Sequence, residues 1–129
     1  MEKEFINPMD MGQRPNKPFS LAVKVEAKKL LFVAGQTSRD VHGNTVGIGD
    51  IRAQTRQIME NIGKILRDGG ATYDDIIKIT MFVADLKDLP GALEVRSEFL
   101  KENKPPSTAV QVGLRKDALL EMEVIAALD

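Results

Sequence analysis

Two stretches of the chain have the hydrophobic spacing of an amphipathic helix. The first follows Asp50, whose carboxylate is suited to accept hydrogen bonds from the free N–H groups of a first helical turn. Its apolar positions recur about every 3.6 residues: Ile51, Ile58, Ile62, Ile65 and Leu66. Gly69-Gly70 ends this helix, because glycine tolerates the left-handed conformation common there. The second helix is predicted to begin at a cap formed by Asp88, with Pro90 in its first turn, and to stop at Lys104-Pro105-Pro106.

Elsewhere the chain has the composition or the polar–apolar alternation of β-strands. We predict strands at residues 21–25, 30–33, 77–83, 108–112 and 120–128, and an extra strand around Phe5-Ile6 is left open. The first two runs are joined through Glu26-Ala27-Lys28-Lys29, which suggests a hairpin, although alanine and lysine are poor turn formers. Residues 7–18 and 38–49 are expected to be loops, because they are rich in proline or glycine and in polar side chains.

The order of these elements predicts one α+β domain over residues 1–129, with a mixed sheet of five or six strands. Two helices are too few to cover both faces of such a sheet, so both are expected on one face, in a two-layer sandwich. Strands 77–83 and 120–128 carry apolar residues on both faces. An apolar sheet face without helices favours self-association over exposure to water, which predicts a closed homo-oligomer.

Composition narrows the classes of function. Lys and Arg number 18 against 19 Asp and Glu, Trp is absent and 5% of residues are aromatic, which argues against a nucleic-acid partner. The absence of Cys removes thiolate nucleophiles and cysteine-based metal sites. The first residues lack the pattern of a signal peptide, and no apolar run approaches about 18 residues. We therefore expect a soluble, cytoplasmic protein without a membrane partner.

No metal or cofactor is expected. His42 is the only histidine, and without a second histidine or a cysteine it cannot anchor a conventional zinc site. Gly43, Gly47 and Gly49 lie close together but match no phosphate-binding glycine motif. We interpret both groups as parts of a solvated loop.

Four segments, in one order and spacing, carry a resemblance to a known family. They are Leu31-Phe32-Val33-Ala34-Gly35-Gln36, residues 50–62 beginning Asp50-Ile51-Arg52, residues 76–86 ending Val83-Ala84-Asp85-Leu86, and the run Leu120-Glu121-Met122-Glu123-Val124-Ile125-Ala126. Together they resemble the Rid family (reactive intermediate deaminases, also called YjgF), in one register from Pro18 to Leu128 with a short gap near Arg115.

The resemblance implies a chorismate-mutase-like fold assembled as a homotrimer, with a barrel of sheets inside a coat of helices and small clefts between subunits. In family members that are enzymes, these clefts hydrolyse enamines and imines derived from amino acids and release ammonia and a keto acid, without cofactor or metal. An Arg binds the substrate carboxylate, a Glu orients the water, and a backbone carbonyl near the Arg helps to hold the imine nitrogen.

Part of the family's site is present. Glu121 falls on the position of the water-orienting Glu, where a carboxylate is suited to general-base work. Gly35 and Gln36 fall on the strand end that lines the site. The alternative for Glu121 is a place beside Glu123 in a solvated stripe, because glutamate is seldom fully buried.

Three other site positions differ from the family. Ser107, followed by Thr108, stands after Pro105-Pro106 where the family carries its Arg; Phe19 stands for a Tyr and Leu93 for an Asn. The loss of the Arg is the most serious change, because a guanidinium can bind a carboxylate through two charge-assisted hydrogen bonds. Either the substrate lacks that carboxylate, another cation binds it, or the deaminase chemistry is gone.

Several residues are candidates for substrate binding. The hydroxyls of Ser107 and Thr108 are able to bind a ligand, although such groups often bond the local backbone. Arg115, in the loop before the last strand, is a candidate replacement cation or an ordinary surface residue, and Arg14, Lys17 and Arg39 are equally open. The candidate site has Glu121 as its catalytic residue and a substrate-binding set of Ser107, Thr108, Gly35, Gln36, Phe19, Leu93 and Arg115.

Three functions remain open on the sequence. The leading hypothesis is a cofactor-independent hydrolytic deaminase of small enamine or imine metabolites, with a substrate altered because Ser107 replaces the family Arg. The alternative is a non-catalytic trimer of the same fold that binds a small ligand or another protein. An endoribonuclease ranks last, because the near-neutral charge and single His give little support for binding and cleaving RNA.

Overall fold

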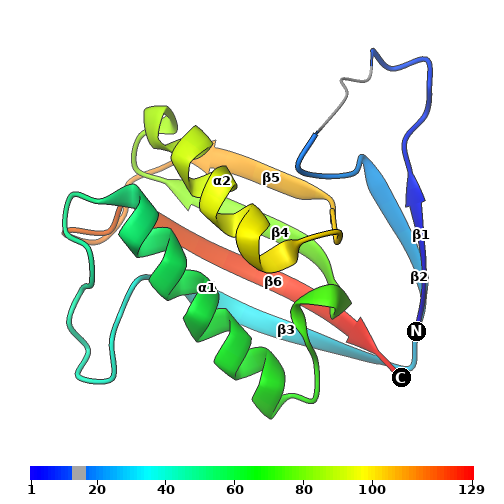
Figure 1. The fold of residues 1–129 in the computed structure, drawn as a ribbon, viewed down its shortest axis with the longest axis horizontal. Helices are drawn as coiled ribbons and strands as arrows, with labels where there is room; N and C mark the ends of the chain where they lie inside the picture. The colour runs from blue at the N-terminus through cyan, green and yellow to red at the C-terminus, as the bar shows by residue number, and fades with distance from the viewer. Residues whose placement is uncertain (13–16) are drawn as a thin grey trace.

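Six strands are divided between two sheets in the computed structural model of the chain, which describes residues 1–12 and 17–129 (Figure 1). The larger sheet has the order β3-β6-β4-β5, and β1 and β2 form a separate pair. The strands are β1 (Glu2–Ile6), β2 (Ala22–Glu26), β3 (Lys29–Gln36), β4 (Ile76–Val83), β5 (Ser107–Gln111) and β6 (Leu120–Leu128). The helices are α1 (Ile51–Asp68) and α2 (Leu89–Leu100), with short 3₁₀ turns η1 (Tyr73–Asp75) and η2 (Leu86–Asp88).

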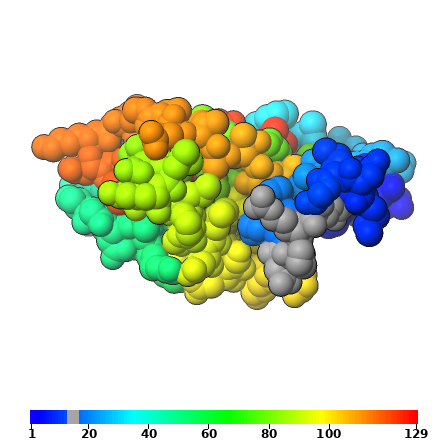
Figure 2. Space-filling view, turned by 90° about the horizontal axis from the view of Figure 1, so that it is seen from above, coloured from blue at the N-terminus to red at the C-terminus, as the bar shows by residue number. Residues whose placement is uncertain are grey.

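Both helices pack on one face of the four-stranded sheet, as Figure 1 shows and as the edge view in Figure 2 confirms. Alternation along β6 divides its side chains between the two faces. Leu120, Met122 and Val124 are buried in the core under the helices, whereas Glu121 and Glu123 point to the other face. Strands β4 and β5 run parallel and the other neighbours antiparallel, so the sheet is mixed. The predicted α+β class, with two helices on one face of a mixed sheet, is confirmed. The predicted size of that sheet, five or six strands, is wrong, because β1 and β2 pair with each other in a sheet of their own.

The hairpin predicted between residues 21–25 and 30–33 is wrong. Both strands exist, but β2 pairs with β1 and β3 pairs with β6. The connection Ala27-Lys28 lacks the glycine or asparagine that a tight hairpin turn requires, so the chain passes from one sheet to the other there. The sixth strand left open around Phe5 is β1, and Lys3 ties it to the main body by donating from Nζ to Asn103 Oδ1 over 2.9 Å.

Helix α1 begins and ends where its sequence predicts. The Asp50 carboxylate accepts hydrogen bonds from the backbone N–H groups of Arg52 and Ala53, each over 3.1 Å. These bonds satisfy two of the donors that a first helical turn leaves free. Gly69 follows the last turn, and its N–H donates to Ile65 O over 3.0 Å.

Helix α2 is also confirmed, but its start differs in detail from the prediction. Asp88 occupies the cap position without making a side-chain capping hydrogen bond, because η2 already continues the chain into the helix. The capping carboxylate is instead that of Asp85, which accepts from Lys87 N over 2.9 Å. No helix in the described residues is both long enough and apolar enough to cross a membrane.

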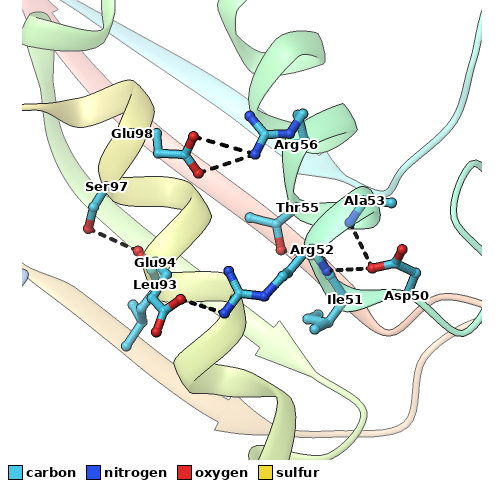
Figure 3. A network of polar contacts seen from close by, with 10 residues as sticks. All are labelled: Asp50, Ile51, Arg52, Ala53, Thr55, Arg56, Leu93, Glu94, Ser97 and Glu98. Atoms are coloured by element: carbon cyan, nitrogen blue, oxygen red, sulfur yellow. Dashed lines mark hydrogen bonds and ion pairs between the residues drawn. The ribbon is translucent and has the colours of Figure 1, made fainter.

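Two ion pairs link the outer surfaces of the helices (Figure 3). Arg52 pairs with Glu94, and one helical turn further on Arg56 Nη2 lies 3.2 Å from Glu98 Oε2. All four side chains are about half exposed or more, so each pair is screened by water and contributes little to stability. These two ion pairs hold α1 and α2 side by side, and the buried core beneath the helices supplies most of the stability.

The sheet face without helices is apolar in its middle. Phe32 is 69% exposed and Leu30 55% exposed on β3, and Val110 is 39% exposed on β5. Phe82 and Ile125 lie half-buried on the strands between them. This group of five residues is called the open face below.

We expect Asp50→Ala to lower the free energy of unfolding by about 1 kcal/mol, because two N–H groups of the first turn of α1 lose their acceptor. Urea denaturation measures the change. Asp50→Asn is the control, since asparagine caps about as well as aspartate. Equal stability of the Ala and wild-type proteins would contradict the cap.

Candidate functional site

A cleft of about 290 Å³ surrounds the Glu121 side chain. Its walls come from the end of β3, the loop that follows it, the loop before β6, and the start of β6 itself. The lining residues are Gly35, Gln36, Thr37, Arg39, Arg115 and Glu121. Two parts of the chain that are far apart in sequence, residues 35–39 and 115–121, therefore meet at this carboxylate.

Glu121 reaches the cleft because residue 35 has no side chain. A β-carbon placed on Gly35 would lie 2.9 Å from the carboxyl carbon of Glu121, closer than packed atoms come. Glu121 itself is half-buried, whereas Glu123, two residues further along the same face, is exposed. Glu121 is therefore set apart from the solvated stripe that the sequence left open as its alternative.

Two arginines bring positive charge to the same cleft. Arg39 and Arg115 are both exposed, and neither forms an ion pair in the described part of the chain. The backbone of Arg39 is fixed, because its carbonyl accepts from Asn61 Nδ2 over 2.9 Å and it bridges to Thr45. The cleft thus combines one half-buried carboxylate with two exposed arginines, so its lining carries a net positive charge that favours a small anion.

Ser107 and Thr108, two of the predicted substrate-binding residues, do not line the Glu121 cleft. Ser107 begins β5 opposite Ile79 of β4, on the side of the helices. Thr108 points to the open side, where its hydroxyl accepts from Lys78 Nζ over 2.8 Å. Glu121 lies opposite Phe82, three residues along β4 from Ile79 and on the other side of the sheet. In one chain, a small substrate in contact with Glu121 therefore does not reach Ser107.

The sequence analysis missed the group that contacts Ser107. Arg96, on the inner side of α2, is fully buried, and its Nη1 donates to Ser107 Oγ over 2.8 Å. Nη1 also lies 3.1 Å from Met81 Sδ, and Nη2 donates to Pro18 O over 3.3 Å. Burial lowers the pKa of Arg96 to about 10, so the guanidinium stays charged at neutral pH. One signal was available: Arg96 interrupts the apolar helical spacing from Ala92 to Leu100.

The remaining sequence candidates do not line the Glu121 cleft. Phe19 is half-buried beside Pro18, and Lys17 Nζ lies 5.9 Å from the centre of its ring. Leu93 is packed against the core on α2, where an Asn side chain would lack the apolar fit. Arg14 lies outside the described residues. Gly35, Gln36, Arg39, Arg115 and Glu121 are therefore the sequence candidates that the structure brings together.

No group of three or more His, Asp or Glu side chains in the described residues is placed to hold a metal ion. His42 lies in the exposed loop between β3 and α1, where its backbone N–H donates to Asp40 Oδ1 over 2.9 Å. That contact closes a local turn. It brings no catalytic partner to the imidazole.

Comparison with known proteins gives the family. Residues 11–128 match the family model described as Endoribonuclease L-PSP. The chain belongs to the Rid/YjgF family. It is 42% identical over 127 residues to a RutC family protein of Pyrococcus abyssi, covering 98% of each chain. It is 35% identical over 127 residues to the 3-aminoacrylate deaminase RutC of Acinetobacter baylyi, again covering 98% of each.

A solved structure agrees with this assignment. The Rid family protein YyfB from Yersinia pestis, described as of unknown function, superposes with a TM-score of 0.86 at 30% identity, covering 99% of this Rid-family chain and 100% of the other. The resemblance noted in the four sequence segments is thereby confirmed at the level of family and fold.

We expect Gly35→Ala to displace the Glu121 carboxylate by several tenths of an ångström or more, because the added β-carbon overlaps it. Crystal structures of the variant and wild type measure the displacement. Gly113→Ala is the matched control, since a β-carbon there meets nothing within 4 Å. An unmoved carboxylate in Gly35→Ala would show that the two residues are not in contact.

Proposed function

We propose that this Rid-family protein is a cofactor-independent deaminase that hydrolyses small enamine or imine metabolites. The carrying observation is the half-buried Glu121 carboxylate in a cleft with two arginines. The similarity to a 3-aminoacrylate deaminase over nearly the whole chain supports the same reaction class, because 3-aminoacrylate is itself an enamine.

In the proposed reaction, the enamine first takes a proton on carbon from solvent and becomes a protonated imine (iminium ion). Glu121 then accepts a proton from a water molecule as its oxygen bonds to the imine carbon, which leaves a carbinolamine. Glu121 then passes its proton to the amino nitrogen and takes the hydroxyl proton as the C–N bond breaks, so that the carbonyl forms and ammonia leaves; Glu121 finally returns that proton to solvent. A carboxylate that alternates between base and acid in this way is an ordinary general acid–base catalyst.

The charge of the cleft selects the substrate. Arg39 and Arg115 attract an anionic substrate at long range, and because both are exposed, this attraction falls as salt rises. Neither Arg39 nor Arg115 lies on a strand, so neither side chain is held as rigidly as the family's Arg, which belongs to a strand. Ser107 at the family's Arg position therefore points to a substrate different from that of family members that keep the Arg.

We also propose that the protein acts as a homotrimer with its sites between subunits. The open face exposes Phe32 and Leu30, which a second copy of the chain would bury. Glu121 and Ser107 lie on opposite sides of one sheet. A site that uses both residues requires Glu121 of one copy to meet Ser107 of another.

A second candidate function has specific support. Phe19 lacks the hydroxyl of the family's Tyr, and Leu93 is packed against the core instead of offering an amide to a ligand. A trimer that binds a small molecule without transforming it fits these replacements. The two functions are distinguished by one measurement: only the deaminase requires Glu121 for ammonia release.

We expect Glu121→Gln to lower kcat/KM about 100-fold or more, because glutamine cannot accept the proton from water and general-base groups contribute at least this much. Ammonia release from enzymatically generated 2-aminoacrylate and from 3-aminoacrylate measures it. Glu123→Gln, the exposed neighbour on the same face, is the control and should keep its activity. Equal rates for wild type and Glu121→Gln would favour the non-catalytic function.

We expect Phe32→Asp to convert the trimer into a monomer of 14.2 kDa, because it places a charge in the buried junction of the open faces. Light scattering coupled to gel filtration measures the mass. Ile48→Asp is the control: Ile48 is 67% exposed, close to the 69% of Phe32, but lies in the loop before α1. A wild-type protein that is itself monomeric would contradict the proposed trimer.

A further inference from the structure

The buried side chain of Gln54 joins the two loops that form the walls of the Glu121 cleft. Gln54 lies on α1 and is fully buried. Its Nε2 donates to Gly47 O over 3.1 Å and to Asp117 O over 2.8 Å, and its Oε1 accepts from Leu119 N over 2.9 Å. Both N–H groups of the amide are therefore in use, as is its oxygen. Gly47 belongs to the loop between β3 and α1, and Asp117 and Leu119 belong to the loop between β5 and β6.

Each of these loops carries one arginine of the cleft. Arg39 lies in the first loop and Arg115 in the second. Among the described residues, no side chain other than that of Gln54 hydrogen-bonds to both loops. Glu121, in contrast, is held by the sheet, since it lies on β6 opposite Phe82 of β4. The separation of the two arginines therefore depends on Gln54, whereas the position of the carboxylate does not.

In the second loop, Gln54 holds a strained turn that contains Arg115. Ala118 N donates to Arg115 O over 3.0 Å, which closes a turn over residues 115–118. Asp117, the third residue of that turn, has a φ of +66°, a left-handed conformation that costs free energy in residues other than glycine. Such a conformation persists where neighbouring contacts fix it. The bond from Gln54 to the Asp117 carbonyl is a contact of this kind, so it holds the turn that carries Arg115.

In the first loop, the path from Gln54 to Arg39 passes through Gly47 and its neighbour Val46. Val46 N donates to Ser38 O over 2.7 Å, and Ser38 Oγ donates to Val46 O over 2.9 Å. Ser38 is buried and directly precedes Arg39. The bond to the Gly47 carbonyl therefore also holds the backbone from which the Arg39 side chain extends.

We propose that Gln54 is a positioning residue of the cleft: it fixes both loops against α1 and so sets the separation of Arg39 and Arg115 beside Glu121. This role rests on the deaminase function proposed above, in which the two arginines attract the substrate. Gln54 does not line the cleft, so it acts only through the loops. Loss of its hydrogen bonds should therefore weaken substrate binding more than it slows the chemical step, because Glu121 stays in place on β6.

The first test compares Gln54→Met with Thr55→Val. Methionine is about as long as glutamine but donates no hydrogen bond. We expect Gln54→Met to raise KM for 3-aminoacrylate about tenfold while kcat changes less than about twofold. Hydrogen exchange should become faster at the amides of Val46 and Leu119, one in each loop, because the loops open more often.

Thr55→Val is the matched control for lost stability. Thr55 is fully buried on the same helix, and its Oγ1 donates to Ile51 O over 2.7 Å, within α1. Its replacement removes a buried hydrogen bond without touching either loop. Thr55→Val should therefore keep the wild-type KM and the wild-type exchange rates of Val46 and Leu119.

The second test perturbs one loop and observes the other. Gly47 has a φ of +76°, and a β-carbon there would lie 2.7 Å from Ala53 Cβ, so Gly47→Ala pushes the first loop away from α1. We expect faster exchange at Leu119 in the second loop, because Gln54 loses one of the groups that hold its amide in place. Gly49→Ala is the matched control: Gly49 has the same φ, but a β-carbon there meets nothing within 4 Å. Leu119 should keep its wild-type exchange rate in Gly49→Ala.

Two results would overturn the proposal: wild-type exchange in either loop of Gln54→Met, or a KM that rises no more than in Thr55→Val. If Gln54→Met does not fold, the glycine variants decide, and equal exchange at Leu119 in Gly47→Ala and Gly49→Ala overturns it.

The exchange measurements do not depend on catalysis. If the protein releases no ammonia but both loops loosen in Gln54→Met, the deaminase function fails and the loop-holding role of Gln54 stands. If ammonia is released and the loops of Gln54→Met stay protected, that role fails and the deaminase stands.

Discussion

The alternation of side chains along β5 and β6 is the constraint on which the site depends. Successive residues of a strand point to opposite faces, so the register that buries Leu120 and Met122 under the helices also sends Glu121 to the other side. The register of β5 places Ser107 on the helix side in the same way. A shift of one residue in β6 would bury the Glu121 carboxylate in the core, and a shift of one residue in β5 would move Ser107 to the other face. Packing of the core therefore fixes the location of the acid and of the hydroxyl.

Much of the fold was predictable because its signals are local. The spacing of α1, the carboxylate of Asp50 and the alternation along β6 each lie within a few residues of the structure they specify. The pairing of β2 was not predictable in this way, because its partner β1 lies beyond a long loop and the connection to β3 only resembles a turn. Asp88 makes no side-chain capping bond for a reason that its own sequence does not show: η2 (Leu86–Asp88) runs directly into α2, and the carboxylate of Asp85 caps η2.

The same distinction between local and long-range signals applies to the site residues. Glu121, Gly35 and Gln36 were found through family segments that are contiguous in sequence, and the fold brings them into one cleft. Arg96 was missed, because its meaning depends on Ser107, a residue of β5 that it meets only after α2 has packed on the sheet. A cation in an apolar helical stripe is a weak sign by itself. That this cation is fully buried, and that no carboxylate among the described residues pairs with it, is visible only in three dimensions.

Burying the charge of Arg96 costs the folded protein free energy. Burial lowers the pKa of Arg96 from its usual range to about 10, which corresponds to a cost of roughly 3 kcal/mol for holding the charge in place. That is a large fraction of the ~5–15 kcal/mol by which small domains are stable. Hydrogen bonds from Nη1 to Ser107 Oγ and from Nη2 to the Pro18 carbonyl offset part of that cost, because they replace some of the water that the guanidinium loses on burial.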